Sequence, residues 1–188
     1  MSIYIIIPAR KNSQRLKMKN KLKIGRNTLV ERAVNFANKI NFSKKIIFTS
    51  DDNYNLKKNK KLLVLKRPKN LAKNNSKMFP VITNAINTLK SNNSNESSVL
   101  LLQPTSPFRS LKLIKQAFIL FKRNNYKYSV VCVSKKINKN KKSTFKIKKN
   151  LLKRSYYLCP KKKYLYEVNG NFYFASLKFL IKHRTFVV

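Results

Sequence analysis

Short apolar runs alternate with amphipathic segments along most of this chain of 188 residues. Continuous runs of β-branched and other apolar residues are typical of strands that are covered on both faces. The runs predict strands over residues 3–8, 44–50, 62–65, 99–103 and 128–133. A further short strand, 172–174, follows a turn predicted at Asn169-Gly170.

The amphipathic segments predict helices. Apolar residues recur at helical spacing over 28–40, 78–89 and 111–123, and a shorter helix is expected over 177–183. Thr28 and Glu31 have the spacing of a capping box, which marks the start of the first helix.

Strands that alternate with helices predict parallel βαβ units. We therefore expect an α/β protein with a three-layer, Rossmann-like fold, a mostly parallel central sheet and one domain over residues 1–188. Residues 135–163 are basic and of low complexity, and we expect an excursion there that carries a short hairpin. The chain has two glycines, Gly25 and Gly170, and neither forms a G-x-G-x-x-G fingerprint or a P-loop.

The charge of the chain is extreme. Forty-four basic residues against five acidic ones give a net charge of +39. One interpretation is a nucleic-acid or anionic-membrane partner. The other, which we favour, is coding bias, because Lys, Asn, Ile, Phe and Tyr are all specified by A/T-rich triplets and the basic residues are spread along the whole chain. Either way, the charge favours anionic substrates.

The remaining composition narrows the class of protein. A hydrophobic content of 43% argues against general disorder. No apolar run approaches the ~20 residues that span a bilayer, and the first apolar run is expected to be a strand rather than a secretion signal. These features favour a cytoplasmic protein without membrane contact. Cys132 and Cys159 are expected to be free thiols, and the single histidine, His183, argues against a His-based triad.

Two polar loops follow predicted strands and are the best candidates for chemistry. The first, Ile-Pro-Ala-Arg-Lys-Asn-Ser-Gln-Arg-Leu-Lys-Met-Lys-Asn, ends at Asn20. The second, Gln-Pro-Thr-Ser-Pro-Phe-Arg, spans 103–109, and its two prolines restrict its shape. In open α/β sheets, ligands bind outside the carboxyl ends of the strands. The alternative for the first loop is a solvated basic segment, and for the second a rigid turn capped by Ser110.

These loops resemble those of the CMP-N-acylneuraminate synthetases, the cytidylyltransferases that activate sialic-acid-type sugars. The pattern Ile-Pro-Ala-Arg-x-x-Ser-x-x-Leu-x-x-Lys-Asn and the Gln-Pro-Thr-Ser-Pro loop carry the resemblance. Two further segments follow in family order, Arg67-Pro68-x-x-Leu71-Ala72 and Asn169-Gly170-x-x-Tyr173. The resemblance implies transfer of CMP from CTP to a nine-carbon sugar acid, with release of pyrophosphate.

The resemblance also implies roles for individual residues. The CTP-binding residues would be Arg10, Ser13, Arg15, Lys19, Asn20 and Arg67, and among them Arg10 and Lys19 would be catalytic because they hold the phosphates. The sugar-binding residues would be Gln103, Thr105, Ser106, Arg109 and Asn169. The resemblance further implies a Mg²⁺ cofactor and a homodimer that pairs near residues 135–163.

The chain departs from the family pattern at several positions. Lys11 and Asn12 stand where glycines are common, and Gln14 where a phosphate-binding lysine is usual. Asn74 and Glu167 replace an aspartate and an arginine.

The acids are few: Glu31, Asp51, Asp52, Glu96 and Glu167. Family members continue to an Asp-x-Asp pair, so we expect that the chain is truncated or degenerate, or that Asp51 and Asp52 serve as metal ligands.

Three functions remain open from sequence. The first is an active cytidylyltransferase for a sialic-like acid, or for a legionaminic, pseudaminic or octulosonic acid. The second is a catalytically weak or inactive member of that family that still binds nucleotide. The third, which no RRM, KH, zinc-finger or helix-turn-helix signature supports, is a basic nucleic-acid-binding protein.

Overall fold

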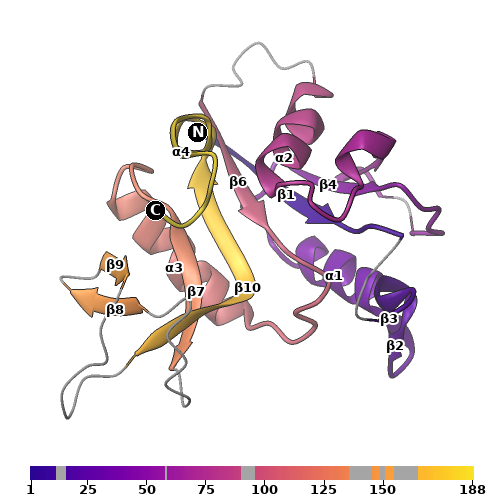
Figure 1. The fold of residues 1–188 in the computed structure, drawn as a ribbon, viewed down its shortest axis with the longest axis horizontal. Helices are drawn as coiled ribbons and strands as arrows, with labels where there is room; N and C mark the ends of the chain where they lie inside the picture. The colour runs from indigo at the N-terminus through magenta and orange to yellow at the C-terminus, as the bar shows by residue number, and fades with distance from the viewer. Residues whose placement is uncertain (12–15, 58, 90–95, 136–144, 149–150, 155–164) are drawn as a thin grey trace.

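The computed structural model describes residues 1–11, 16–57, 59–89, 96–135, 145–148, 151–154 and 165–188. Its centre is an eight-stranded sheet with the strand order β5-β4-β1-β6-β10-β8-β9, in which β7 also pairs with β10 (Figure 1). Four neighbouring strands are parallel: β5 (Leu62–Lys66), β4 (Lys45–Ser50), β1 (Ser2–Pro8) and β6 (Ser97–Leu101). The predicted α/β fold with a mostly parallel core is confirmed.

The other half of the sheet is antiparallel. β10 (Tyr166–Ser176) runs antiparallel to β6 and to β7 (Val130–Lys135). β8 (Phe145–Lys148) and β9 (Leu151–Arg154) form an antiparallel hairpin, as expected for the basic segment. A separate hairpin of β2 (Lys23–Ile24) and β3 (Asn27–Thr28) was not predicted.

The segment around Asn169-Gly170 differs from its prediction. We expected a turn followed by a strand, but β10 continues through both residues, with a register shift between Val168 and Tyr173. Gly170 has φ +76°, which residues with a Cβ adopt only under strain. The irregularity therefore bends one long strand, as a β-bulge does, instead of ending it.

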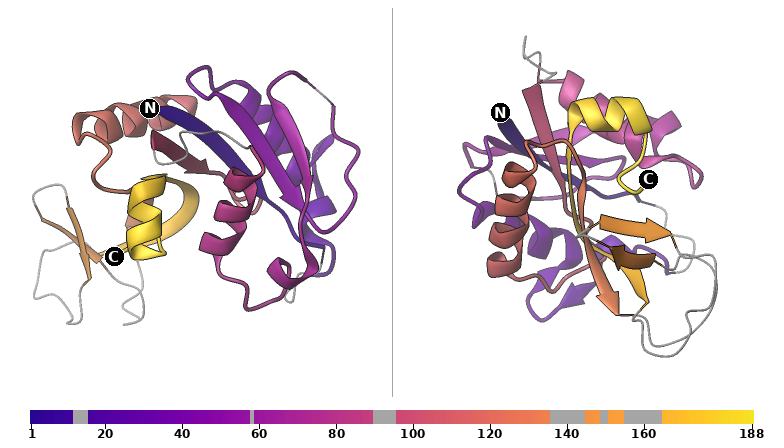
Figure 2. Two further views of the ribbon diagram at one scale, coloured as in Figure 1. Left: turned by 90° about the horizontal axis from the view of Figure 1, so that it is seen from above. Right: turned by 90° about the vertical axis from the view of Figure 1, so that its left-hand side faces the viewer.

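Helices cover both faces of the sheet (Figure 2). α1 (Leu29–Asn38) and α3 (Leu111–Arg123) share one core cluster, and α2 (Met78–Asn87) and α4 (Leu177–His183) contribute to the other. Successive residues of β1 alternate between them, Ile5 in the first and Ile6 in the second. Two short 3₁₀ helices, η1 (Lys19–Lys21) and η2 (Lys69–Leu71), lie in loops.

Local sequence signals explain where these helices begin. Thr28 accepts a hydrogen bond from the backbone N–H of Glu31, while the Glu31 carboxylate accepts one from the N–H of Thr28, so the predicted capping box is present. Ser110 caps α3 by accepting from the N–H of Leu113. In the described part of the chain, no helix has the length and apolar character that crossing a bilayer requires.

Candidate functional site

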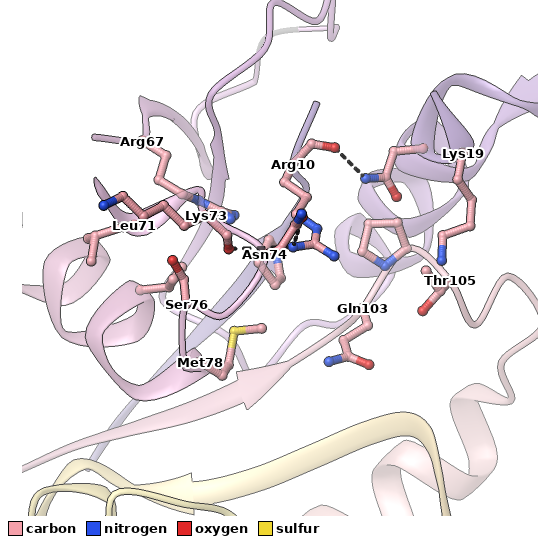
Figure 3. Close-up of a pocket in the computed structure, with 14 residues that line it drawn as sticks. Arg10, Lys19, Arg67, Leu71, Lys73, Asn74, Ser76, Met78, Gln103 and Thr105 are labelled. Atoms are coloured by element: carbon pink, nitrogen blue, oxygen red, sulfur yellow. Dashed lines mark hydrogen bonds between the residues drawn. The ribbon is translucent and has the colours of Figure 1, made fainter. Parts of the chain in front are cut away.

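A pocket opens at the carboxyl ends of the parallel strands (Figure 3). Its volume is about 280 Å³, near the lower end of the range of small-molecule sites. Segments after β1, β5 and β6 meet there, since parallel strands end at the same edge of a sheet. The lining residues are Pro8, Arg10, Lys19, Asn20, Arg67, Leu71, Lys73, Asn74, Ser76, Met78, Val81, Gln103, Pro104 and Thr105.

Arg10 lies in the middle of this pocket, between the loop after β5 and the loop after β6 (Figure 3). Its Nη1 donates to Asn74 Oδ1 at 3.1 Å and approaches the carbonyl of Lys73 at 3.4 Å. The Nδ2 of the buried Asn20 donates to the Arg10 carbonyl at 3.0 Å. Asn20 therefore fixes the backbone of the loop that carries Arg10. Neutral oxygens position this guanidinium and leave its charge available to an anion.

Arg67 is the buried cation of the pocket, with 6% of its surface exposed. Its Nη2 donates to the carbonyl of Thr49 at 2.7 Å, which ties the end of β5 to β4. Burial lowers the pKa of Arg67, the nearby Arg10 lowers it further, and Asp51 acts in the opposite direction. A guanidinium desolvated to this degree interacts strongly with any oxygen or anion that reaches it.

The pocket lining is cationic and rich in amides. Among the lining residues that the structure describes, Arg10, Lys19, Arg67 and Lys73 contribute four positive charges, and none carries a carboxylate. Amide groups come from asparagine and glutamine side chains, and hydroxyls from Ser76 and Thr105. Such a lining can neutralise a polyphosphate and hydrogen bond to a base or a sugar.

The two acids after β4 hold the first loop in place. Asp51 Oδ1 accepts from the backbone N–H of Lys11 at 2.9 Å, and Asp52 forms an ion pair of 2.8 Å with Lys21. For Asp52, burial works to raise the pKa, but hydrogen bonds from Lys21 and the Asn53 N–H give a net lowering. Among the described residues, no three His, Cys, Asp or Glu side chains gather as a metal cluster would require.

The second loop is only partly in the pocket. Gln103 and Thr105 line it, whereas Ser106 lies beside Gly170 of β10. A Cβ built on Gly170 would lie 3.4 Å from Gln103 Oε1, 3.6 Å from Ser106 Oγ and 3.7 Å from the Tyr173 hydroxyl. The bulge of β10 and the second loop thus bring three polar groups together next to the pocket.

Arg109 does not line the pocket with Arg10 and Lys19. It lines a different groove, together with α1 residues and Phe108. Its Nε donates to the carbonyl of Asn171 at 2.9 Å, and its Nη2 donates to the carbonyl of Gln103. Of Arg10, Lys19 and Arg109, which the resemblance assigned to substrate binding, the first two line this pocket and Arg109 does not.

The remaining predicted residues are placed as follows. Asn169 is exposed and outside the pocket, and its Oδ1 accepts from the backbone N–H of Asn171 at 3.0 Å, which stabilises the bend. Ser13 and Arg15 lie outside the described residues.

Sequence reasoning missed Lys73 and Ser76 as lining residues. Both lie on the segment after Arg67-Pro68-x-x-Leu71-Ala72, so the signal was their closeness to a recognised motif.

Comparison with solved structures agrees with this architecture. A CMP:2-keto-3-deoxy-manno-octonic acid synthetase solved with CTP superposes with a TM-score of 0.70 at 13% identity, over 98% of this chain and 77% of that one. The 2-C-methyl-D-erythritol 4-phosphate cytidylyltransferase of Francisella tularensis gives 0.63 at 17% identity, over 97% and 76%. At such identities the likeness establishes the fold.

The family follows from the sequence itself. A family model described as "Cytidylyltransferase" matches residues 4–186, nearly the whole chain. The match includes both polar loops and every strand that contributes to the cationic pocket. The chain belongs to the cytidylyltransferase family, whose members use CTP as the nucleotide substrate.

Proposed function

We propose that this protein transfers CMP from CTP to a sialic-acid-like nine-carbon sugar acid and releases pyrophosphate. The observation that carries the proposal is the pocket at the carboxyl end of the parallel strands, whose described lining has four cations, several amides and no carboxylate. Both substrates are anions, so catalysis requires positive charge that is fixed before they bind.

In this proposal Arg10 and Lys19 hold the triphosphate, with Ser13 and Arg15 of the same loop as further ligands. Arg67, a buried guanidinium in the pocket lining, approaches the cytosine. The anomeric hydroxyl of the sugar attacks the α-phosphate in line. The chain accelerates this step by orienting the reactants and by stabilising the negative charge that moves to the pyrophosphate.

The acceptor would lie beside the second loop, in contact with Gln103, Thr105, Ser106 and, at the bend of β10, Asn169. The Gln-Pro-Thr-Ser-Pro sequence favours a sialic-like acid over legionaminic, pseudaminic or octulosonic acid. Structural neighbours are named for an octonic acid and for a methylerythritol phosphate, and each of these acceptors also carries an acidic group. An acidic acceptor is thus the chemistry that these proteins share.

Magnesium would enter with the nucleotide, held mainly by phosphate oxygens and water, since the described carboxylates do not form a set of ligands. Gln14, which stands where the family has a phosphate-binding lysine, favours a second candidate function, a nucleotide-binding protein with little or no turnover. In that case CTP would raise the melting temperature, yet no pyrophosphate would be released.

We also propose that the protein is a homodimer that pairs through the β8–β9 hairpin. Ile147 and Leu151 on this hairpin are 48% and 43% exposed, and burial of such side chains would favour association. Sedimentation equilibrium at high salt, which screens the net charge, would show a dimer if this is right and a monomer if it is wrong.

Pyrophosphate release tests the main proposal. The purified chain is incubated with CTP, Mg²⁺ and a panel of sialic, legionaminic, pseudaminic and octulosonic acids, and with methylerythritol phosphate as a comparison. We expect turnover that is highest with the sialic-like acid. Turnover with methylerythritol phosphate alone would overturn the assignment of the acceptor, and no turnover with any of them would overturn the enzymatic proposal.

A pair of variants then locates the site. Lys19→Met should weaken CTP binding by ten- to a hundred-fold, in line with about 1.5–3 kcal/mol for a hydrogen bond to a charged group. Lys178→Met removes the same charge from an exposed position on α4, outside the pocket, and should leave CTP binding unchanged. Equal losses in both variants would mean that CTP responds to the net charge and not to this pocket.

A further inference from the structure

The second loop has two sides. Gln103 and Thr105 face the cationic pocket, while Pro107, Phe108 and Arg109 line a groove formed with α1. The two sides belong to one short segment, so whatever fixes the groove side also decides where the pocket side points.

Arg109 attaches the groove side of the second loop to β10. Its Nε and Nη2 donate to the backbone carbonyls of Asn171 and Gln103, which joins β10 to the first residue of the loop. The guanidinium also lies over the ring of Phe36 on α1, 6.0 Å from its centroid. Burial lowers the pKa of Arg109 to about 10, and the guanidinium remains charged at neutral pH.

The geometry of the guanidinium leaves little for a ligand. A carboxylate is held bidentately by two neighbouring nitrogens, either Nε with Nη2 or Nη1 with Nη2. Nε and Nη2 are already occupied by carbonyls, and Nη1 is buried, with no hydrogen-bond partner within the described structure. Neither edge of Arg109 is therefore open to the carboxylate of a sugar acid.

Other contacts fasten the same segment. Asn171 Nδ2 donates to the carbonyl of Phe108 at 2.9 Å, so β10 holds the loop at two points. On the other side, Arg32 of α1 lies over the Phe108 ring at 5.4 Å while its Nη1 donates to the carbonyl of Ile24 at 3.3 Å. The loop is thus held between α1 and the bulge of β10.

We infer that Arg109 is a positioning residue, which holds the Gln103 carbonyl and so aims the Gln103 side chain at the acceptor, instead of binding the sugar acid itself. Asn171 supports it from β10. The inference rests on the proposed function for the identity of the acceptor, but the attachment of the loop is independent of turnover. It predicts that loss of Arg109 frees the loop and weakens acceptor use through Gln103.

Hydrogen exchange tests the attachment in the intact chain, whether or not it is active. The amide of Ser106, which donates to the Gln103 carbonyl at 3.1 Å, serves as the probe. Arg109→Met should accelerate its exchange at least ten-fold. Arg109→Lys should accelerate it less, because an ammonium still donates hydrogen bonds, although it cannot reach both carbonyls in the same planar arrangement. Arg26→Met removes an exposed charge from the β2–β3 turn and should leave the exchange rate as it is.

Asn171→Ala is the second variant, in case Arg109→Met unfolds, and it should also accelerate exchange of the Ser106 amide. Unchanged exchange in a folded Arg109 or Asn171 variant would overturn the attachment. If the wild-type chain releases no pyrophosphate, the proposed function fails, and this measurement still decides the attachment.

Steady-state kinetics separate positioning from direct binding. In an active enzyme, Arg109→Lys should raise the KM for the acceptor about ten-fold and leave the KM for CTP unchanged. The rise should be the same for the sugar acid and for its carboxamide, because the loop and not the acceptor charge is affected. A loss confined to the acid would assign Arg109 as its ligand and overturn the inference.

Discussion

The two glycines of the chain permit a matched test of the acceptor side. Gly170 and Gly25 both have left-handed backbone conformations, with φ of +76° and +63°. A Cβ at Gly25 would meet no atom within 4 Å, whereas a Cβ at Gly170 would lie among Gln103 Oε1, Ser106 Oγ and the Tyr173 hydroxyl. Gly25→Ala therefore reproduces the backbone strain of Gly170→Ala without its local effect.

The expected loss of stability is similar for the two substitutions. A left-handed conformation costs an L-residue about 1–2 kcal/mol. Reduced freedom of the unfolded chain returns about 0.4–1 kcal/mol. The net loss of about 1 kcal/mol corresponds to a fall of about 2–4 °C in the melting temperature of a protein of this size. At 3.4 Å or more, the contacts of the new methyl group are ordinary, so Gly170→Ala should not unfold the protein.

The effect on the acceptor should differ. In Gly170→Ala, the methyl group takes the space between three polar groups that we propose face the sugar, so we expect the KM for the acceptor to rise about ten-fold, or about 1.4 kcal/mol. The KM for CTP should stay the same in both variants. Kinetics and thermal unfolding are measured side by side. Equal acceptor KM values for Gly25→Ala and Gly170→Ala would refute the placement of the acceptor beside the bulge.

Three further predictions concern the capping box, the core and the pocket. Thr28→Ala should lower the free energy of unfolding by about 1 kcal/mol in urea, because it removes the hydroxyl that caps α1. Glu31→Gln removes the carboxylate whose pKa the Thr28 backbone N–H and hydroxyl lower, so its loss of stability should be present above the ordinary pKa of 4.5 and disappear as the pH falls through the lowered value; a loss that is independent of pH would contradict the role of Glu31. Phe174→Ala, in the centre of the core, should cost about 3–5 kcal/mol by the same measurement, and a loss below 1 kcal/mol would contradict its packing. Asn74→Asp should weaken CTP binding in calorimetry, since the new carboxylate would pair with Arg10 and compete with the phosphates, and unchanged affinity would show that Arg10 does not hold them.

Much of the fold could be predicted because the signals are local. The strand β1 (Ser2–Pro8) is an unbroken apolar run from Ile3 onward, and the helix over 111–123 was predicted with the bounds that the structure has. Capping by Thr28 and Ser110 follows from hydrogen bonds within one turn. The bend of β10 was misread as a turn, because Asn-Gly favours both a hairpin turn and a bulge. Only pairing with β7 on both sides of the bend distinguishes them.

The candidate site was predictable in part, for a related reason. The loops with Arg10, Lys19 and Gln103 follow parallel strands. Because parallel strands have their carboxyl ends at the same edge of a sheet, the topology predicted that these loops meet. The direction in which a side chain points depends on partners from other parts of the chain, and the topology does not give it. Arg109 belongs to the same motif as Gln103, yet it turns to the groove because two backbone carbonyls are within its reach there.

The amino-acid sequence by itself determined the strands of the parallel core, the helix starts, the cationic character of the loops and, through their motifs, the family. The tertiary structure decided which of those cations share a pocket and which support it. Asp51 and Asp52 became anchors of the first loop, and Arg109 an attachment of the second. The physical reason is that a charged side chain takes the partners nearest to it in the folded protein, and those partners come from distant parts of the chain.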